Sequence, residues 1–259
     1  MKDSESQNIS QRQRNLYISM HEEYEAHYYD AMSMKYRNLF FLDPLLSGLD
    51  FNGKKVADLA CGSGHNSKEV LKRFPRVDIM GFDISPAACK AYKEVVGRPS
   101  YELDLTLGSS PLRDFDAAMM IGGLHHCASN LKGTLKTISS LLKPGATFLM
   151  MEPSSDFFLQ TVREVWYKND RHFDASTEQA LCHDQILSQA QPWFSLKDVC
   201  YTGGPGYFLV YNSLLFRMPQ PIKKIISPPI ILLEKYYNKL PGKRIFPCFI
   251  SRWTRTHQK

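Results

Sequence analysis

A strand-like run ends in a turn of small residues between Val56 and Gly64, in the order Val-Ala-Asp-Leu-Ala-Cys-Gly-Ser-Gly. The apolar start indicates a buried strand, and the residues after the turn indicate a helix. Ala60, Gly62 and Ser63 in this turn carry little or no side chain. A ligand can therefore approach the backbone closely, where N–H groups point outward at a helix start. This stretch predicts a fold in which a strand, a tight loop and a helix meet at a ligand.

Short apolar runs alternate with longer amphipathic runs from Lys54 onward. This alternation predicts right-handed βαβ units and an α/β fold, Rossmann-like, with a mostly parallel sheet of about seven strands and helices on both faces. Ser85-Pro86 marks a helix start, and Lys143-Pro144-Gly145 marks a helix end. The predicted strands are 55–60, 77–82, 100–104, 115–121 and 145–151, and the predicted helices are 63–74, 85–96 and 129–143.

Further segments flank or interrupt this predicted domain. The first 48 residues indicate a flexible start followed by a helical lid, because apolar groups recur at helical spacing. The end of the chain is basic and apolar, and its six prolines predict only short helices. The predicted division is a lid at 1–48, a Rossmann-like domain at 49–216 and an extension at 217–259. Within the Rossmann-like domain, an irregular lid insertion is predicted at 153–175 and a helix at 176–190. Two strands at 194–201 and 206–216 are predicted to form a hairpin.

Acidic residues follow the first three predicted strands. Asp58 ends the first strand, Asp83 the second and Asp104 the third. Ligands of open α/β sheets bind outside the carboxyl ends of the strands. An acid about 20 residues after the glycine-rich turn is the expected acceptor for ribose hydroxyls. Asp104 is placed to accept the amine of an adenine, with Leu105 packing on the ring. The sequence therefore predicts an adenosine site.

The chain resembles the class I S-adenosylmethionine-dependent methyltransferases over residues 54–153. The motifs that carry the resemblance are Val56–Gly64, Gly81-Phe82-Asp83, Asp104-Leu105, Phe115-Asp116 with Leu124-His125-His126, and Leu141-Leu142-Lys143-Pro144-Gly145. It implies S-adenosyl-L-methionine as cofactor and S-adenosyl-L-homocysteine as product. Ala60 stands where the family has its first loop glycine. The implied cofactor-binding residues are Asp58, Ala60, Gly62, Ser63, Gly64, Asp83, Ile84, Asp104, Leu105 and Ile121.

Two other ligand-binding classes are alternatives. A nicotinamide-dependent dehydrogenase has the pattern Gly-x-Gly-x-x-Gly after its first strand, but Ser67 occupies the third glycine position here. Two successive acids also suit an adenosine without a pyrophosphate bridge. The second class is a non-catalytic protein, a sensor or a partner subunit, that binds the methyl donor or its demethylated product.

The candidate catalytic residues follow the fourth and fifth strands. His125 or His126 is predicted to act as the base that deprotonates a hydroxyl acceptor, with Glu152 as its partner. O-methylation is favoured, with C-methylation as the alternative. A structural alternative stays open for each residue, since a histidine can cap the next helix and a carboxylate can bind backbone N–H groups.

Missing motifs narrow the acceptor class. Ile121-Gly122-Gly123-Leu124 stands where an Asn/Asp-Pro-Pro-aromatic motif would indicate methylation of amides or nucleobase amines. Cys127 does not follow a proline, so the nucleophile for cytosine C5 is missing. The acid-rich strand end of magnesium-dependent catechol methylation is also missing, and no metal is expected. A small-molecule acceptor is favoured over nucleic acid, and an RNA methyltransferase that uses the basic tail is the alternative.

Aromatic and basic residues before and after the predicted sheet are candidates for acceptor contacts, because lid aromatics exclude water and stack on apolar ligands. Arg37 and Arg171 are candidate partners of an anionic group, with simple exposure to water as the alternative. The predicted substrate-binding residues are Tyr24, Tyr28, Tyr29, Tyr36, Trp166, Tyr167, Arg171 and His172.

The net charge of +6 is unevenly distributed. Residues 217–259 hold ten Lys or Arg and one acid, a net +9, which leaves −3 for residues 1–216. The tail is compatible with a solvated cationic surface, an anionic membrane surface, a lipid or phosphorylated ligand, or a partner protein. Six scattered cysteines, a polar N-terminus and no long apolar run predict a cytoplasmic protein, with peripheral membrane contact through the tail as an option. The oligomeric state stays open.

Overall fold

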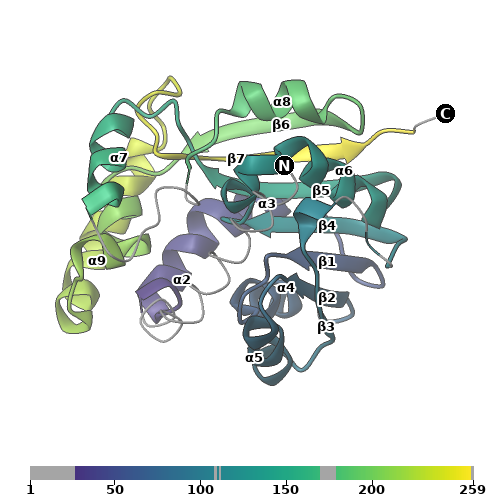
Figure 1. Ribbon diagram of the computed structural model, residues 1–259. Helices are drawn as coiled ribbons and strands as arrows, with labels where there is room; N and C mark the ends of the chain where they lie inside the picture. Colours follow the sequence, from purple (N-terminus) through teal and green to yellow (C-terminus); the bar gives the residue numbers. More distant parts are fainter. Residues whose placement is uncertain (1–26, 108–109, 111, 170–178, 258–259) are drawn as a thin grey trace.

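A seven-stranded sheet forms the centre of the molecule in the computed structural model, which describes residues 27–107, 110, 112–169 and 179–257 (Figure 1). The strand order is β3-β2-β1-β4-β5-β7-β6. The first five strands pair in parallel, and β7 runs antiparallel to both of its neighbours. The strands are β1 (Lys55–Leu59), β2 (Asp78–Asp83), β3 (Ser100–Glu102), β4 (Phe115–Ile121), β5 (Leu142–Pro153), β6 (Phe194–Thr202) and β7 (Cys248–Arg255).

Helices cover both faces of this sheet, as the sequence predicts (Figure 1). One face carries α2, α3, α4 and α9, and the other carries α6 and α8. The α-helices are α2 (Ala31–Arg37), α3 (Asp43–Leu46), α4 (His65–Arg73), α5 (Pro86–Val96), α6 (Leu131–Leu141), α7 (Gln160–Asn169), α8 (His183–Ala190) and α9 (Gln220–Tyr237). Shorter π- and 3₁₀-helical turns are η1 (Asn38–Leu42), η2 (Leu105–Leu107), η3 (Leu124–Asn130), η4 (Tyr207–Tyr211) and η5 (Ser213–Phe216).

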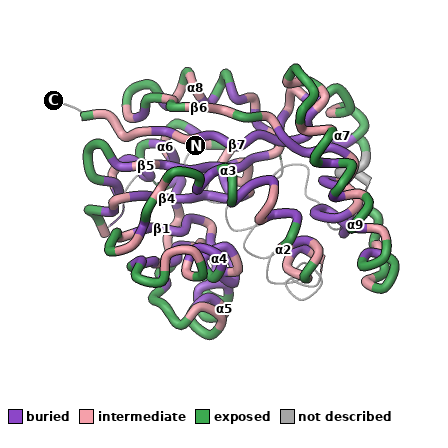
Figure 2. The backbone as a smooth tube through the Cα atoms, turned by 180° about the vertical axis from the view of Figure 1, so that it is seen from behind, coloured by how far each residue is buried: buried purple, intermediate pink, exposed green. Residues whose placement is uncertain are grey.

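Alternation along the central strands divides the core into two layers. Met119 and Ile121 of β4 pack with the N-terminal helices and α9, whereas Met120 between them packs with α6 and α8. Successive side chains of a strand point to opposite faces, so a strand covered on both sides is apolar throughout. The buried backbone in Figure 2 follows this sheet. The predicted α/β, Rossmann-like fold is confirmed.

The predicted hairpin is wrong. Residues 206–216 form η4 and η5, and the antiparallel partner of β6 is β7, from the end of the chain. Tyr207, Val210, Tyr211 and Leu214 are buried at spacings of three and four residues, which is the helical period and not the alternation of a strand. The sheet therefore takes one of its strands from the predicted C-terminal extension.

The prediction that prolines limit the tail to short helices is also wrong. Helix α9 has 18 residues, with Pro228 and Pro229 in its interior. Proline has no N–H, so the carbonyls of Lys224 and Ile225 lose their hydrogen bonds within the helix. Lys224 and Ile225 are both exposed to water. Among the helices that the structure describes, none is both long enough and apolar enough to cross a membrane.

The insertion after β5 differs in part from its prediction. A helix, α7, occupies residues 160–169, where an irregular segment is predicted. The predicted helix at 176–190 corresponds to α8, which begins at His183. Residues 170–178 lie outside the described part of the chain.

Candidate cofactor and acceptor site

The strand order reverses at β1, whose neighbours are β2 and β4. This reversal opens a crevice at the carboxyl edge of an open α/β sheet. Asp58 stands near the end of β1 and is buried, and one of its carboxylate oxygens accepts a hydrogen bond of 2.7 Å from the Ser67 hydroxyl. That hydroxyl in turn accepts from Tyr92 at 2.8 Å. Burial raises the pKa of Asp58 to about 7, the Ser67 hydrogen bond opposes this rise, and the charge of Asp83 adds to it.

The loop after β1 owes its shape to three left-handed backbone positions. Ala60, Gly62 and Gly64 have φ values of 51°, 52° and 82°, a region that L side chains seldom adopt. A Cβ added to Gly64 would lie 2.2 Å from Val96 Cγ2. A Cβ added to Gly123, after β4, would lie 2.6 Å from the Cβ of Ala60. The two loops therefore touch at their smallest residues.

Asp83, the last residue of β2, ties this loop to the next strand. Its Oδ2 accepts from the backbone N–H of Gly62 at 3.0 Å, and its Oδ1 accepts from Ser85 N–H at 2.9 Å. Asp83 is only partly buried. Because the carboxylate is partly exposed, a ligand hydroxyl can reach it.

Asp104 lies two residues after β3 and is also partly buried. Its Oδ1 accepts from the backbone N–H of Thr106 at 2.8 Å and from the Thr106 hydroxyl at 2.6 Å. Asp104 Oδ2 accepts no hydrogen bond from the described residues. Leu105 beside it is buried.

Glu152 and His125 form a buried pair where β4 and β5 end. Glu152 Oε1 accepts from the backbone N–H groups of Gly123 at 3.0 Å and Leu124 at 2.6 Å. Its Oε2 accepts from the backbone N–H of His125 at 3.2 Å and lies 2.7 Å from Nδ1 of the same residue. Glu152 therefore binds backbone N–H groups and also contacts a histidine, and its role as the partner of a catalytic base stays a prediction.

Burial sets the charge of this pair. It raises the pKa of Glu152, and the three backbone N–H donors oppose that rise. Burial also lowers the pKa of His125, so its ring is neutral near pH 7. A neutral ring that donates from Nδ1 to Glu152 keeps a lone pair on Nε2, and Nε2 has no hydrogen-bond partner among the described residues. The His126 ring lies beside it, with ring centroids 3.9 Å apart.

The residues predicted to contact the methyl acceptor fall into three groups. Tyr29 stacks on His65, directly after the small-residue loop, with ring centroids 4.3 Å apart. Tyr28 and Tyr36 are buried, and their hydroxyls donate to Asn212 and Glu234, so their positions do not favour contact with a ligand. Tyr24, Arg171 and His172, and the side chains of Trp166 and Tyr167, lie outside the described residues.

Arg37 and Tyr211 meet near the end of β4, a contact that the sequence did not predict. Arg37 is buried, and its guanidinium donates to Asn66 at 2.7 Å and to the Tyr211 hydroxyl at 3.4 Å. That hydroxyl lies 4.0 Å from the position of a Cβ on Gly122. The sequence predicts a strand at residues 206–216. Nothing in that prediction brings Tyr211 to this edge of the sheet.

Comparison with known proteins finds methyltransferases. A family of methyltransferase domains matches residues 57–148, which include Asp58, Asp83, Asp104 and both histidines. This match supports the predicted resemblance to the class I S-adenosylmethionine-dependent methyltransferases. The matched segment ends within β5, so α9 and β7 lie beyond it.

A curated relative matches about half of this chain. The ribosomal protein L11 methyltransferase of Vibrio cholerae is 30% identical over 137 residues, which are 52% of this chain and 45% of the relative. The chain thus spans about half the length of the curated relatives that it matches.

Two solved structures share the fold over nearly the whole chain. An S-adenosylmethionine-dependent methyltransferase of Thermotoga maritima has a TM-score of 0.59 at 14% identity, covering 93% of this chain and 97% of its own. The plantazolicin methyltransferase BpumL, solved with S-adenosylhomocysteine, has a TM-score of 0.57 at 11% identity, covering 98% and 99%.

Proposed function

We propose that this chain transfers a methyl group from S-adenosylmethionine to a small, hydrophobic or lipid-like metabolite, with O-methylation favoured over C-methylation. The observation that carries the proposal is the pair of His125 and Glu152, joined at 2.7 Å. A carboxylate that binds Nδ1 of a neutral imidazole leaves Nε2 as the atom that can accept the proton of a hydroxyl. The pair stands at the same sheet edge as Asp58 and Asp83.

The residues of this edge fit the proposed cofactor. Asp83 and Asp104 are partly exposed carboxylates at the ends of neighbouring strands. The ribose diol and the adenine amine are both hydrogen-bond donors, which suits two carboxylate acceptors. Asp83 would hold the diol, and Asp104 the amine with Leu105 against the ring. Two acids at neighbouring strand ends also suit an adenosine without a pyrophosphate bridge.

The polypeptide's own part in the reaction is to position groups and to take up a proton. When bound, the cofactor supplies a methyl group on a positively charged sulfur. Gly62 and Gly64 would border its methionyl part, and Asp58 would orient the amino group. Glu152 fixes the ring of His125 through Nδ1, so that Nε2 can accept the proton of an acceptor hydroxyl.

We expect Asp83→Ala to abolish cofactor binding, measured by calorimetry with S-adenosylhomocysteine. The substitution removes the acceptor for the diol and also releases the Gly62 N–H. Asp83→Asn is the matched control, because its amide oxygen can still accept one of these bonds, so we expect binding that is weaker than wild type but measurable. Tight binding by Asp83→Ala would refute the assignment of the cofactor site.

We expect replacement of His125 and His126 by Ala to slow turnover by roughly 10²–10⁴-fold, the usual contribution of a general base. Affinity for S-adenosylhomocysteine should stay within about twofold of wild type, since neither ring is assigned to the cofactor. The two single variants identify which histidine is the base. A turnover rate unchanged in the double variant would remove the histidines from the mechanism.

The main alternative is a macromolecular acceptor, because the Vibrio cholerae relative is a ribosomal protein methyltransferase. Cell extract incubated with the protein and methyl-labelled cofactor separates the candidates. We expect label in the small-molecule fraction, and label in precipitated protein or in RNA would favour the alternatives. S-adenosylhomocysteine binding without label in any fraction would indicate a non-catalytic binding protein.

A further inference from the structure

Helix α9 buries three polar side chains and exposes several large apolar ones, while Ile231 packs on the core. Lys223, Ser227 and Glu234 are completely buried. Ile225 is 76% exposed and Tyr236 is 63% exposed. A surface helix of a globular protein has the opposite arrangement, with its apolar stripe on the core.

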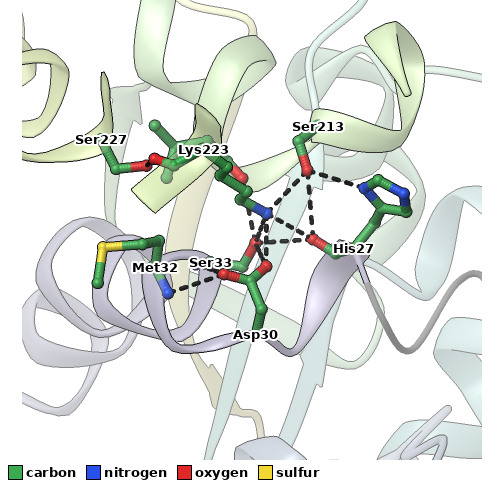
Figure 3. Close-up of polar contacts among 8 residues, drawn as sticks. His27, Asp30, Met32, Ser33, Ser213, Lys223 and Ser227 are labelled. Atoms are coloured by element: carbon green, nitrogen blue, oxygen red, sulfur yellow. Dashed lines mark hydrogen bonds and ion pairs between the residues drawn. The ribbon is translucent and has the colours of Figure 1, made fainter. Parts of the chain in front are cut away.

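The buried polar residues hold α9 in this orientation. Lys223 Nζ lies among the Asp30 carboxylate, the Ser33 and Ser213 hydroxyls and the backbone carbonyl of His27 (Figure 3). A rotation that buried the apolar stripe would break these contacts and leave the Asp30 carboxylate without its ammonium partner. Lys223 therefore fixes the outward direction of the apolar side.

A second buried contact fixes the other half of the helix. Glu234 accepts hydrogen bonds from the Tyr36 hydroxyl and from the backbone N–H of Gly206, the latter at 2.9 Å. The two anchors stand on either side of the proline pair. The exposed apolar surface of α9 is thus a fixed feature of the fold.

The outward side of α9 combines one apolar stripe with lysines. Its exposed apolar residues recur at spacings of three and four, which aligns them on one face, and exposed lysines lie along the helix and just after it. Glu234, the single acid of α9, is buried, so no carboxylate offsets these charges. The stripe comprises Ile222, Ile225, Pro229, Leu232 and Tyr236, and the lysines are Lys224, Lys235 and Lys239.

Exposed apolar side chains continue onto α7. Phe158 just before this helix, and Val162 and Val165 within it, are each more than half exposed, at 59%, 59% and 57%. Helices α7 and α9 lie at the same end of the molecule in both views (Figures 1 and 2). Exposed apolar patches of this kind mark interaction sites.

We propose that α9 docks this protein on the surface of an anionic membrane. The apolar stripe would enter the headgroup region, and Lys224, Lys235 and Lys239 would contact lipid phosphates. A bilayer surface matches both properties of this face, since it accepts apolar side chains and attracts cations. A protein partner with a conventional interface core would leave the lysines without an equal number of acids. The proposal does not depend on the methyl-transfer reaction.

The test is co-sedimentation of the full chain with vesicles of phosphatidylcholine alone or with phosphatidylglycerol. We expect binding only to the anionic vesicles, weakened by added salt. Lys224→Glu/Lys235→Glu should lower the partition coefficient at least about thirtyfold, since each basic residue near such a surface contributes to binding. Lys132→Glu/Lys136→Glu, an equal charge change on α6, is the matched control and should stay within about twofold of wild type.

Ile225→Ser/Leu232→Ser should also reduce binding, at both low and high salt, while thermal unfolding and S-adenosylhomocysteine binding stay unchanged. The same binding to neutral vesicles, or the same loss in the α6 control, would overturn the proposal. So would a dimer in sedimentation that Ile225→Ser/Leu232→Ser dissociates, because a second copy would then cover the face. Failure of the methyltransferase assignment would appear separately, as lack of S-adenosylhomocysteine binding by the wild type.

Discussion

The carboxyl group of Asp58 is removed from water and held by the hydroxyl of Ser67. Desolvation disfavours the charged form, which is why its pKa rises to about 7. The sequence predicts an acid at this strand end. It does not predict the burial, because Ser67 and Tyr92 lie on separate helices that meet only in the folded chain.

This burial predicts a pH-dependent stability. The folded-state pKa of Asp58 lies above the unfolded value near 4, so its stabilising contribution is complete below pH 4 and is lost as the pH rises to about 7. Asp58→Asn removes the titration and can still accept from Ser67. We expect the variant to gain on the order of 4 kcal/mol relative to wild type between pH 4 and 7.5, measured by urea unfolding. Parallel pH profiles of the two proteins would contradict this.

At the scale of elements, the small-residue loop is shaped by its neighbours as much as by its own residues. Gly64 begins α4 and lies against Val96 and Tyr92 of α5. Gly48, after α3, has a similar φ of 74°, but a Cβ added there would have nothing within 4 Å. The two glycines therefore separate the cost of backbone strain from the cost of a steric clash.

We expect Gly48→Ala to lower the free energy of unfolding by about 1 kcal/mol, the cost of a left-handed alanine. Gly64→Ala carries the same cost and also an overlap at 2.2 Å, so we expect a further loss of about 1–3 kcal/mol. Thermal and urea unfolding of both variants provide the measurement. Equal losses of unfolding free energy in the two variants would show that α5 moves aside at no energetic cost.

At the scale of the whole molecule, β7 connects β6 to the rest of the sheet. It pairs with β5 over Thr147–Pro153 and with β6 over most of its length. Without β7, β6 would have no neighbour in the sheet, and β5 would present an open edge. The sheet thus depends on residues far beyond the matched methyltransferase segment.

A chain that ends at residue 247 should therefore lose cooperative unfolding, whereas a chain that ends at residue 257 should behave as the full chain does. The first lacks β7 completely, and the second keeps it. Circular dichroism during heating measures the difference. A cooperative transition in the shorter chain, at the temperature of the longer one, would show that β7 is dispensable.

The sequence by itself determined the alternating α/β pattern, the five parallel strands and the acids at their ends, because local periodicity and turn residues carry that information. It also indicated the histidines after β4. Only the tertiary structure decided that β7 completes the sheet, that α9 is a single helix and that Tyr36 lies in the core. These outcomes depend on contacts such as Lys223 with Asp30 and Tyr36 with Glu234, between residues nearly 200 positions apart, for which local periodicity carries no signal.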